Sequence, residues 1–164
     1  MIQIDFASLE LADIEKVIFG DDVEISDISK RRVDESFDFL KDFSKNKIIY
    51  GINTGFGPMA QYKIEEEEQI ALQYNLIRSH ASGSGAPLDD IYVRASMLAR
   101  LNTLSLGYSG VNRSALEVLI QLINHEVTPL IFEHGGVGAS GDLVQLAHLA
   151  LVMIGEGQVK YQGK

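Results

Sequence analysis

Apolar residues recur at three- and four-residue intervals through most of this chain, and that spacing favours helices over strands. The first such stretch carries Leu11, Ile14, Val17 and Ile18 and stops at Gly20. We therefore expect a mainly α fold. The predicted helices are one around 11–18, one around Val33–Leu40 capped by Ser26 or Ser29, one from Glu65 to His80, one from Pro87 to Gly107, one over about Arg113–Asn124 and one beginning at Asp142.

Two segments are predicted to be extended. Lys47-Ile48-Ile49-Tyr50 is a short apolar run before a glycine-rich loop, and it predicts a strand over 47–50. Near the carboxyl end, Val159-Lys160-Tyr161 follows the turn Gly155-Glu156-Gly157 and predicts the start of a hairpin at 158–162. The small residues of 81–87 predict an ordinary loop between two helices.

Composition limits the class of partner. The net charge of −9, with 23 acidic against 14 basic residues, argues against nucleic acid and against an anionic membrane. The chain has no cysteine, which excludes disulfides and thiolate metal sites. The longest nearly apolar run, 143–154, is shorter than the roughly 20 residues of a membrane span, and the first residues lack a charged-then-apolar leader. A cytoplasmic location and small-molecule partners are expected.

One glycine-rich segment could undergo a reaction of its own backbone. It is the run Gly135-Gly136-Val137-Gly138-Ala139-Ser140-Gly141-Asp142, which places Ala-Ser-Gly in a flexible turn ahead of an apolar helix. Ala139 offers an unhindered carbonyl, Gly141 an amide nitrogen with no Cβ beside it, and Ser140 a hydroxyl that can be eliminated. Cyclisation with loss of two waters would produce a methylidene-imidazolone ring. Glycine neighbours supply the unusual backbone angles that such a closure requires.

The same run allows other interpretations. Gly136–Gly141 matches G-x-G-x-x-G, and Thr128–Phe132 could be the strand before a dinucleotide turn. That fingerprint needs an acidic residue at the end of a second strand, whereas Glu156 lies in a turn before the next strand-like piece. A nucleotide-binding module is therefore a minority hypothesis. The run can also be an ordinary helix N-terminus. A second Ala-Ser-Gly at 81–83 shows that the tripeptide alone is a weak signal.

Three segments together are more specific. YGINTGFG at 50–57, SHASGSG at 79–85 and GGVGASGDL at 135–143 resemble the amino-terminal part of the aromatic amino acid ammonia-lyases, the family of the histidine, phenylalanine and tyrosine ammonia-lyases and the related aminomutases. The resemblance extends over essentially all 164 residues. It implies a single amino-terminal domain over 1–164 of the L-aspartase-like fold, truncated before the family's carboxy-terminal helical bundle. It also implies a homotetramer and an inactive fragment.

The resemblance assigns roles to residues. Ala139, Ser140 and Gly141 would form the methylidene-imidazolone (MIO) prosthetic group, with no external cofactor. Tyr50 would be the base that removes the substrate's β-proton, which requires its phenol pKa to fall from about 10 toward neutrality. The helix beginning at Asp142 would direct its positive dipole end at the ring. No metal is expected, because no histidine has metal-ligand spacing such as H-E-x-x-H.

The substrate stays open between two amino acids. In the family the residues at the place of Ser79 and His80 contact the substrate's ring, and Ser-His resembles the histidine enzymes, which convert L-histidine to urocanate. The bacterial branch most similar over the full length includes tyrosine ammonia-lyases, which form p-coumarate, with the same Ser-His pair. Tyrosine or phenylalanine 2,3-aminomutase activity is a further alternative. His148, in the last helix, is predicted to be a core histidine with satisfied polar atoms.

Overall fold

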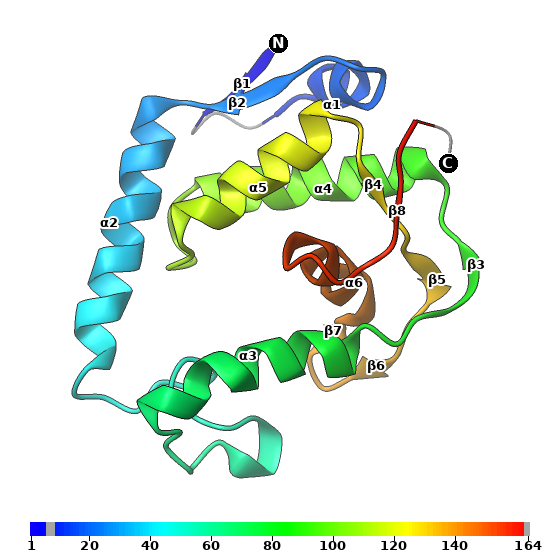
Figure 1. The fold of residues 1–164 in the computed structure, drawn as a ribbon. Coiled ribbons are helices and arrows are strands. Elements are labelled where there is room, and N and C mark those ends of the chain that lie inside the picture. The colour runs from blue at the N-terminus through cyan, green and yellow to red at the C-terminus, as the bar shows by residue number, and fades with distance from the viewer. Residues whose placement is uncertain (6–8, 163–164) are drawn as a thin grey trace.

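The computed structural model describes residues 1–5 and 9–162, and α-helices dominate that part of the chain (Figure 1). The mainly α prediction is confirmed. The helices are α1 (Leu11–Ile18), α2 (Asp27–Ser44), α3 (Glu66–His80), α4 (Asp90–Ser105), α5 (Arg113–Asn124) and α6 (Val144–Met153), with a 3-10 turn, η1, at Gly57–Met59. The strands are β1 (Ile2–Ile4), β2 (Val23–Ile25), β3 (Ser84–Pro87), β4 (Thr128–Pro129), β5 (Phe132–His134), β6 (Val137–Gly138), β7 (Gly141–Asp142) and β8 (Val159–Lys160).

The strands form small pairs between the helices. β1 and β2 pair in parallel on either side of α1, with Ile4 opposite Ile25. The other pairs are antiparallel and join distant segments: β3 with β5, and β4 with β8. β6 and β7 form a local hairpin. Each pair therefore fixes where a helix enters or leaves the bundle.

Side-chain caps fix the start of two helices. The Ser26 hydroxyl accepts a hydrogen bond from the Ser29 backbone N–H at 3.1 Å at the start of α2, so one of the two predicted caps is confirmed. Asn112 caps α5 in the same way, through the Ser114 N–H at 2.9 Å. Each cap satisfies an N–H that has no partner within the helix.

The core forms around α4. Its side chains Met97, Leu98 and Leu101 are fully buried, and α4 packs against α1, α2 and α5. Leu116 and Leu119 of α5 are also fully buried. Removing one such side chain from water contributes roughly 1.5–3 kcal/mol, so this cluster supplies most of the stability of the part of the chain that the structure describes.

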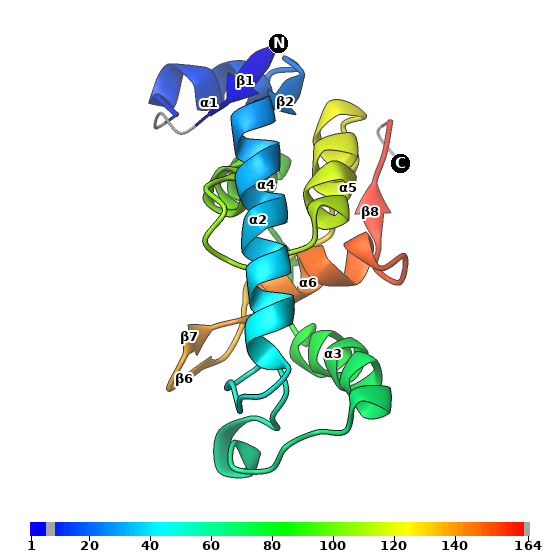
Figure 2. The same cartoon turned by 90° about the vertical axis from the view of Figure 1, so that its left-hand side faces the viewer.

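Helix α2 runs along one side of the molecule and carries the 45–65 loop at its far end, where α3 begins (Figure 2). Gly107 and Gly110, in the turn after α4, make this packing possible. A Cβ on Gly107 would lie 2.8 Å from the Arg32 backbone, and one on Gly110 would overlap the Leu40 side chain. Both glycines have positive φ angles, of 73° and 61°.

The predicted strand over 47–50 is wrong, because this segment is irregular backbone. The Asn53 side chain takes the place of a strand partner. Its Oδ1 accepts from the Ile49 N–H at 2.8 Å, and its Nδ2 donates to the carbonyls of Ser44 and Lys47. Asparagine side chains often satisfy nearby backbone groups in this way, and strand propensity cannot anticipate it.

Three smaller boundaries also differ from the sequence prediction. Pro87 belongs to β3 and not to α4, because it pairs with Phe132, so 81–87 is not a simple loop. Helix α6 begins at Val144, two positions after Asp142, because Asp142 is part of β7. The hairpin start expected at 158–162 is present only as the strand β8, whose partner is the distant β4 and not a following strand of the described residues.

Replacing Asn53 by Ala should lower the free energy of unfolding by about 1–3 kcal/mol, because buried backbone groups lose their partners. Asn53 is 4% exposed. Asn46, in the same loop, is exposed, and Asn46→Ala should change the free energy by less than about 0.5 kcal/mol. Urea denaturation of the full-length protein measures both. Equal effects of the two substitutions would contradict the role given to Asn53.

Candidate active site

The Ala-Ser-Gly segment lies at the tip of the β6–β7 hairpin. Gly138 pairs with Gly141, so that Ala139 and Ser140 form the two-residue turn between them. Residues 133–140 are all exposed. Gly141 has a φ of 81°, and no heavy atom lies within 4 Å of where its Cβ would be. The three residues therefore have the room and the backbone freedom that a cyclisation between them requires.

Asp142 joins this hairpin to α6. Its carboxylate accepts hydrogen bonds from the Val144 N–H at 3.0 Å and from Gln145 Nε2 at 3.1 Å. The Val144 bond, the Gln145 bond and a further one from the Gly136 backbone lower the pKa of Asp142. A Cβ on Gly135 would overlap this carboxylate. Glycine at 135 thus leaves room for this carboxylate, and Asp142 fixes the hairpin on the first turn of α6.

Tyr50 lies at the start of the 50–57 loop, and its side chain is 62% exposed. The backbone N–H of Gly57 donates to the tyrosine hydroxyl at 3.4 Å, and the ring contacts Phe56 edge to face, with centroids 5.9 Å apart. Thr54, which is 1% exposed, accepts from the Gly51 N–H and donates to the Gly55 carbonyl. Buried polar side chains such as Thr54 thus order the loop backbone, while the Tyr50 side chain stays exposed to solvent.

Ser79 and His80 are the last two residues of α3. His80 Nδ1 lies 2.8 Å from the Leu76 carbonyl oxygen, and Ser79 Oγ lies 3.1 Å from the same nitrogen. A carbonyl can only accept, so Nδ1 donates and carries the proton. In the neutral imidazole, Nε2 is then left as an acceptor.

The chain does not bring these residues together. The 45–65 loop with Tyr50 lies at the amino-terminal end of α3, and the hairpin lies toward its carboxyl end (Figure 1). Helix α3 has 15 residues and so spans about 22 Å at 1.5 Å per residue. Ser79 and His80 are at the carboxyl end of α3, which packs against α6.

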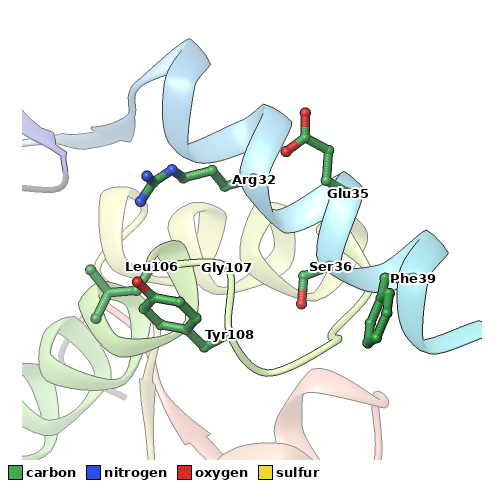
Figure 3. A pocket seen from close by; sticks show the side chains of 7 residues that line it. All are labelled: Arg32, Glu35, Ser36, Phe39, Leu106, Gly107 and Tyr108. Carbon is green, nitrogen blue, oxygen red and sulfur yellow. The ribbon is translucent and has the colours of Figure 1, made fainter. Parts of the chain in front are cut away.

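A cavity of about 420 Å³ lies elsewhere, between α2 and the turn after α4. Figure 3 shows Arg32, Glu35 and Phe39 of α2 on one side and Tyr108 on the other. None of the residues predicted for the site lines it.

Over residues 1–5 and 9–162, no group of three or more His, Cys, Asp or Glu side chains could hold a metal ion. In the same residues, no helix is both long and apolar enough to cross a membrane.

The glycine run does not form a dinucleotide turn. Such a turn connects a strand of a parallel sheet to a helix. Gly136–Gly141 instead lies in an antiparallel hairpin, and the preceding strand, β5, pairs antiparallel with β3. The nucleotide-binding hypothesis thus lacks the strand–turn–helix geometry on which it depends.

Two contacts around the site were not predicted as functional. The Gly83 N–H donates to His148 Nε2 at 3.0 Å, which connects the chain after α3 to α6. Arg78 forms a two-pronged ion pair with Glu156, with Nε to Oε2 at 2.8 Å. The sequence predicts His148 to be a core histidine, but its ring is only half-buried, with Nε2 accepting from the Gly83 N–H. Its partner is 65 residues away, which no local pattern could indicate.

Comparison with known proteins identifies the family. The family of aromatic amino acid lyases matches residues 9–164. A probable histidine ammonia-lyase of Thermoplasma acidophilum is 45% identical over 100% of this chain and 34% of its own length. The histidine ammonia-lyase of Bacillus subtilis is 42% identical over 100% of this chain and 33% of its own length.

Solved structures agree. A tyrosine aminomutase from Streptomyces globisporus superposes with a TM-score of 0.91 and 34% identity, over 99% of this chain and 31% of its own. The histidine ammonia-lyase of Trypanosoma cruzi gives a TM-score of 0.87 and 33% identity, over 99% of this chain and 32% of its own. The chain belongs to the aromatic amino acid lyase family. It spans about a third of the length of these curated relatives.

Replacing Gly135 by Ala should displace the Asp142 carboxylate and release the first turn of α6. Loss of such a capping contact costs about 1 kcal/mol, so amide exchange at Val144 should accelerate about fivefold. Gly136→Ala is the matched control, because nothing lies within 4 Å of its added Cβ. Hydrogen exchange on the full-length protein measures both, and equal acceleration in the two variants would contradict the close approach described here.

Proposed function

We propose that this chain is the amino-terminal part of a non-oxidative ammonia-lyase that converts L-histidine to urocanate and ammonia. The observation that carries the proposal is the Ala139-Ser140-Gly141 hairpin tip, fixed by Asp142 on a helix N-terminus in a chain of the aromatic amino acid lyase family. The named relatives at 42–46% identity are histidine ammonia-lyases, which supports the substrate.

The hairpin residues fit the family's prosthetic group. Ala139, Ser140 and Gly141 would form the MIO group, which supplies an electrophile for the substrate's amino group. Gly141 is open and has a positive φ, whereas Gly83 of the second Ala-Ser-Gly is enclosed. A Cβ on Gly83 would lie 2.9 Å from His148 Nε2 and 3.1 Å from Phe132 Cβ. These contacts support cyclisation at 139–141 and a linear segment at 81–83.

Tyr50 is the proposed base. Its hydroxyl oxygen accepts from the Gly57 N–H, and the side chain is otherwise exposed, so the oxygen is open to a substrate. Removing a β-proton requires a basic oxygen within reach of the substrate. Since Tyr50 and the hairpin lie toward opposite ends of α3, we propose that a homotetramer brings Tyr50 of one copy to the hairpin of another.

Ser79 and His80 are the proposed contacts to the substrate ring. With Nδ1 committed to the Leu76 carbonyl, Nε2 of neutral His80 can accept a hydrogen bond from an imidazole N–H. A phenol O–H could donate to the same atom. Tyrosine is therefore the second candidate substrate, with p-coumarate as product, and the similarity to a tyrosine aminomutase favours it. Tyrosine or phenylalanine 2,3-aminomutase chemistry is the remaining alternative.

In the full-length enzyme, peptide mass mapping should show loss of two waters at Ser140 and an unmodified Ser82. Ser140→Ala should abolish both the ring's absorbance and turnover. Tyr50→Phe should keep the absorbance and lower kcat by about 10²–10⁴-fold, because a general base contributes about that much. A linear Ser140 in active enzyme would overturn the proposed electrophile. Near-normal turnover of Tyr50→Phe would return the tyrosine to a packing role.

His80→Leu should shift the preference of the full-length enzyme toward L-phenylalanine. Leucine leaves the substrate's ring N–H or O–H unpaired, which costs about one to two powers of ten in specificity. Assays of L-histidine, L-tyrosine and L-phenylalanine with wild type and variant measure the shift. Wild-type preference for histidine supports the first candidate and preference for tyrosine the second, whereas unchanged ratios in the variant would exclude contact between His80 and the ring.

A further inference from the structure

One junction connects three segments that the proposed function uses. The Gly83 N–H donates to His148 Nε2 at 3.0 Å. The His148 ring contacts Phe132 edge to face, with centroids 5.4 Å apart. Gly83 also lies against Val144, since its Cβ would meet Val144 Cγ1 at 3.2 Å. We call Gly83, Phe132, Val144 and His148 the glycine junction.

The glycine junction lies next to both halves of the proposed site along the chain. Gly83 is three residues after His80, the proposed ring contact. Phe132 begins β5, which leads into the glycine run, and Val144 begins α6 directly after the hairpin. The side chain of His148 reaches back from the second turn of α6 to the chain that leaves α3.

We propose that His148 is a positioning residue, which fixes the ring-contacting end of α3 relative to the electrophile hairpin through its hydrogen bond from Gly83. This inference rests on the proposed function. The bond joins Gly83, just after α3, to a residue of α6, the helix whose first turn also carries the Asp142 cap. The two-pronged ion pair of Arg78 with Glu156 is exposed, and it joins α3 to the turn after α6, farther along the chain from the hairpin.

The chemistry of the contact requires an acceptor. The Gly83 N–H is partly buried, and its only acceptor among the described residues is His148 Nε2, so removing that acceptor leaves the N–H without a protein partner. Burial lowers the pKa of His148, which favours the neutral ring and leaves Nε2 free to accept. Leucine at 148 would fill similar space but could not accept, whereas the glutamine carbonyl oxygen could.

The experiment compares His148→Leu and His148→Gln in the full-length enzyme. His148→Leu should raise KM about tenfold, with a smaller change in kcat, and should reduce the preference for the best substrate over L-phenylalanine. His148→Gln should restore KM and preference to near wild type. Hydrogen exchange of the peptide containing Gly83 should be fast in the Leu variant and slow in wild type and the Gln variant. His125→Leu, at the exposed end of α5, is the matched control and should change none of these quantities.

The outcomes separate this inference from the function on which it rests. Wild type without ring absorbance or ammonia release would refute the proposed function itself. Active wild type with unchanged KM and preference in His148→Leu would overturn the positioning role, and so would equal impairment in the Leu and Gln variants. If the Leu variant does not fold, His148→Met, which keeps length without a strong acceptor, takes its place in the same comparison.

Discussion

Burial of α4 is the constraint on which the rest of the structure depends. Its side chains Met97, Leu98 and Leu101 are fully buried, and α1, α2 and α5 pack around it. Each of these three helices therefore covers one face of α4. Tight packing leaves little freedom in where these helices end. The turn after α4 must approach the backbone of α2, and Gly107 allows that approach. The volume and shape of the buried side chains thus set the positions of the helices near the core.

Away from α4, hydrogen bonds from single polar side chains, and not a packed apolar core, fix the position of the backbone. Asn53 satisfies the backbone of the tyrosine loop, Asp142 caps α6 from the hairpin, and His148 accepts from Gly83. In each case one side chain bonds to backbone groups that have no ladder or helix partner. Such bonds define a geometry without a surrounding core, because an unpaired buried N–H is costly. The segments of the proposed site can then be ordered while remaining at the surface.

Sequence patterns predict the parts governed by local rules. The spacing of Leu11 and Val17 and the Ser26 cap anticipate α1 and α2, because periodicity and capping act within a few residues. They fail at 47–50, where Asn53 replaces a strand partner, and at Pro87, where pairing with Phe132 overrides the preference for a helix start. The motifs point to Tyr50, His80 and Ser140 as candidates, but periodicity carries no information on their separation across α3.

The glycine run shows why residue identity and packing must be considered together. Ala81-Ser82-Gly83 and Ala139-Ser140-Gly141 are the same tripeptide, yet only the second combines an open glycine with a positive φ. The glycine of 81–83 lies against Phe132, Val144 and His148, and its N–H donates to His148 Nε2. Under the proposed function, the imidazole contact that links α6 to the end of α3 would also disfavour cyclisation at 81–83 relative to 139–141.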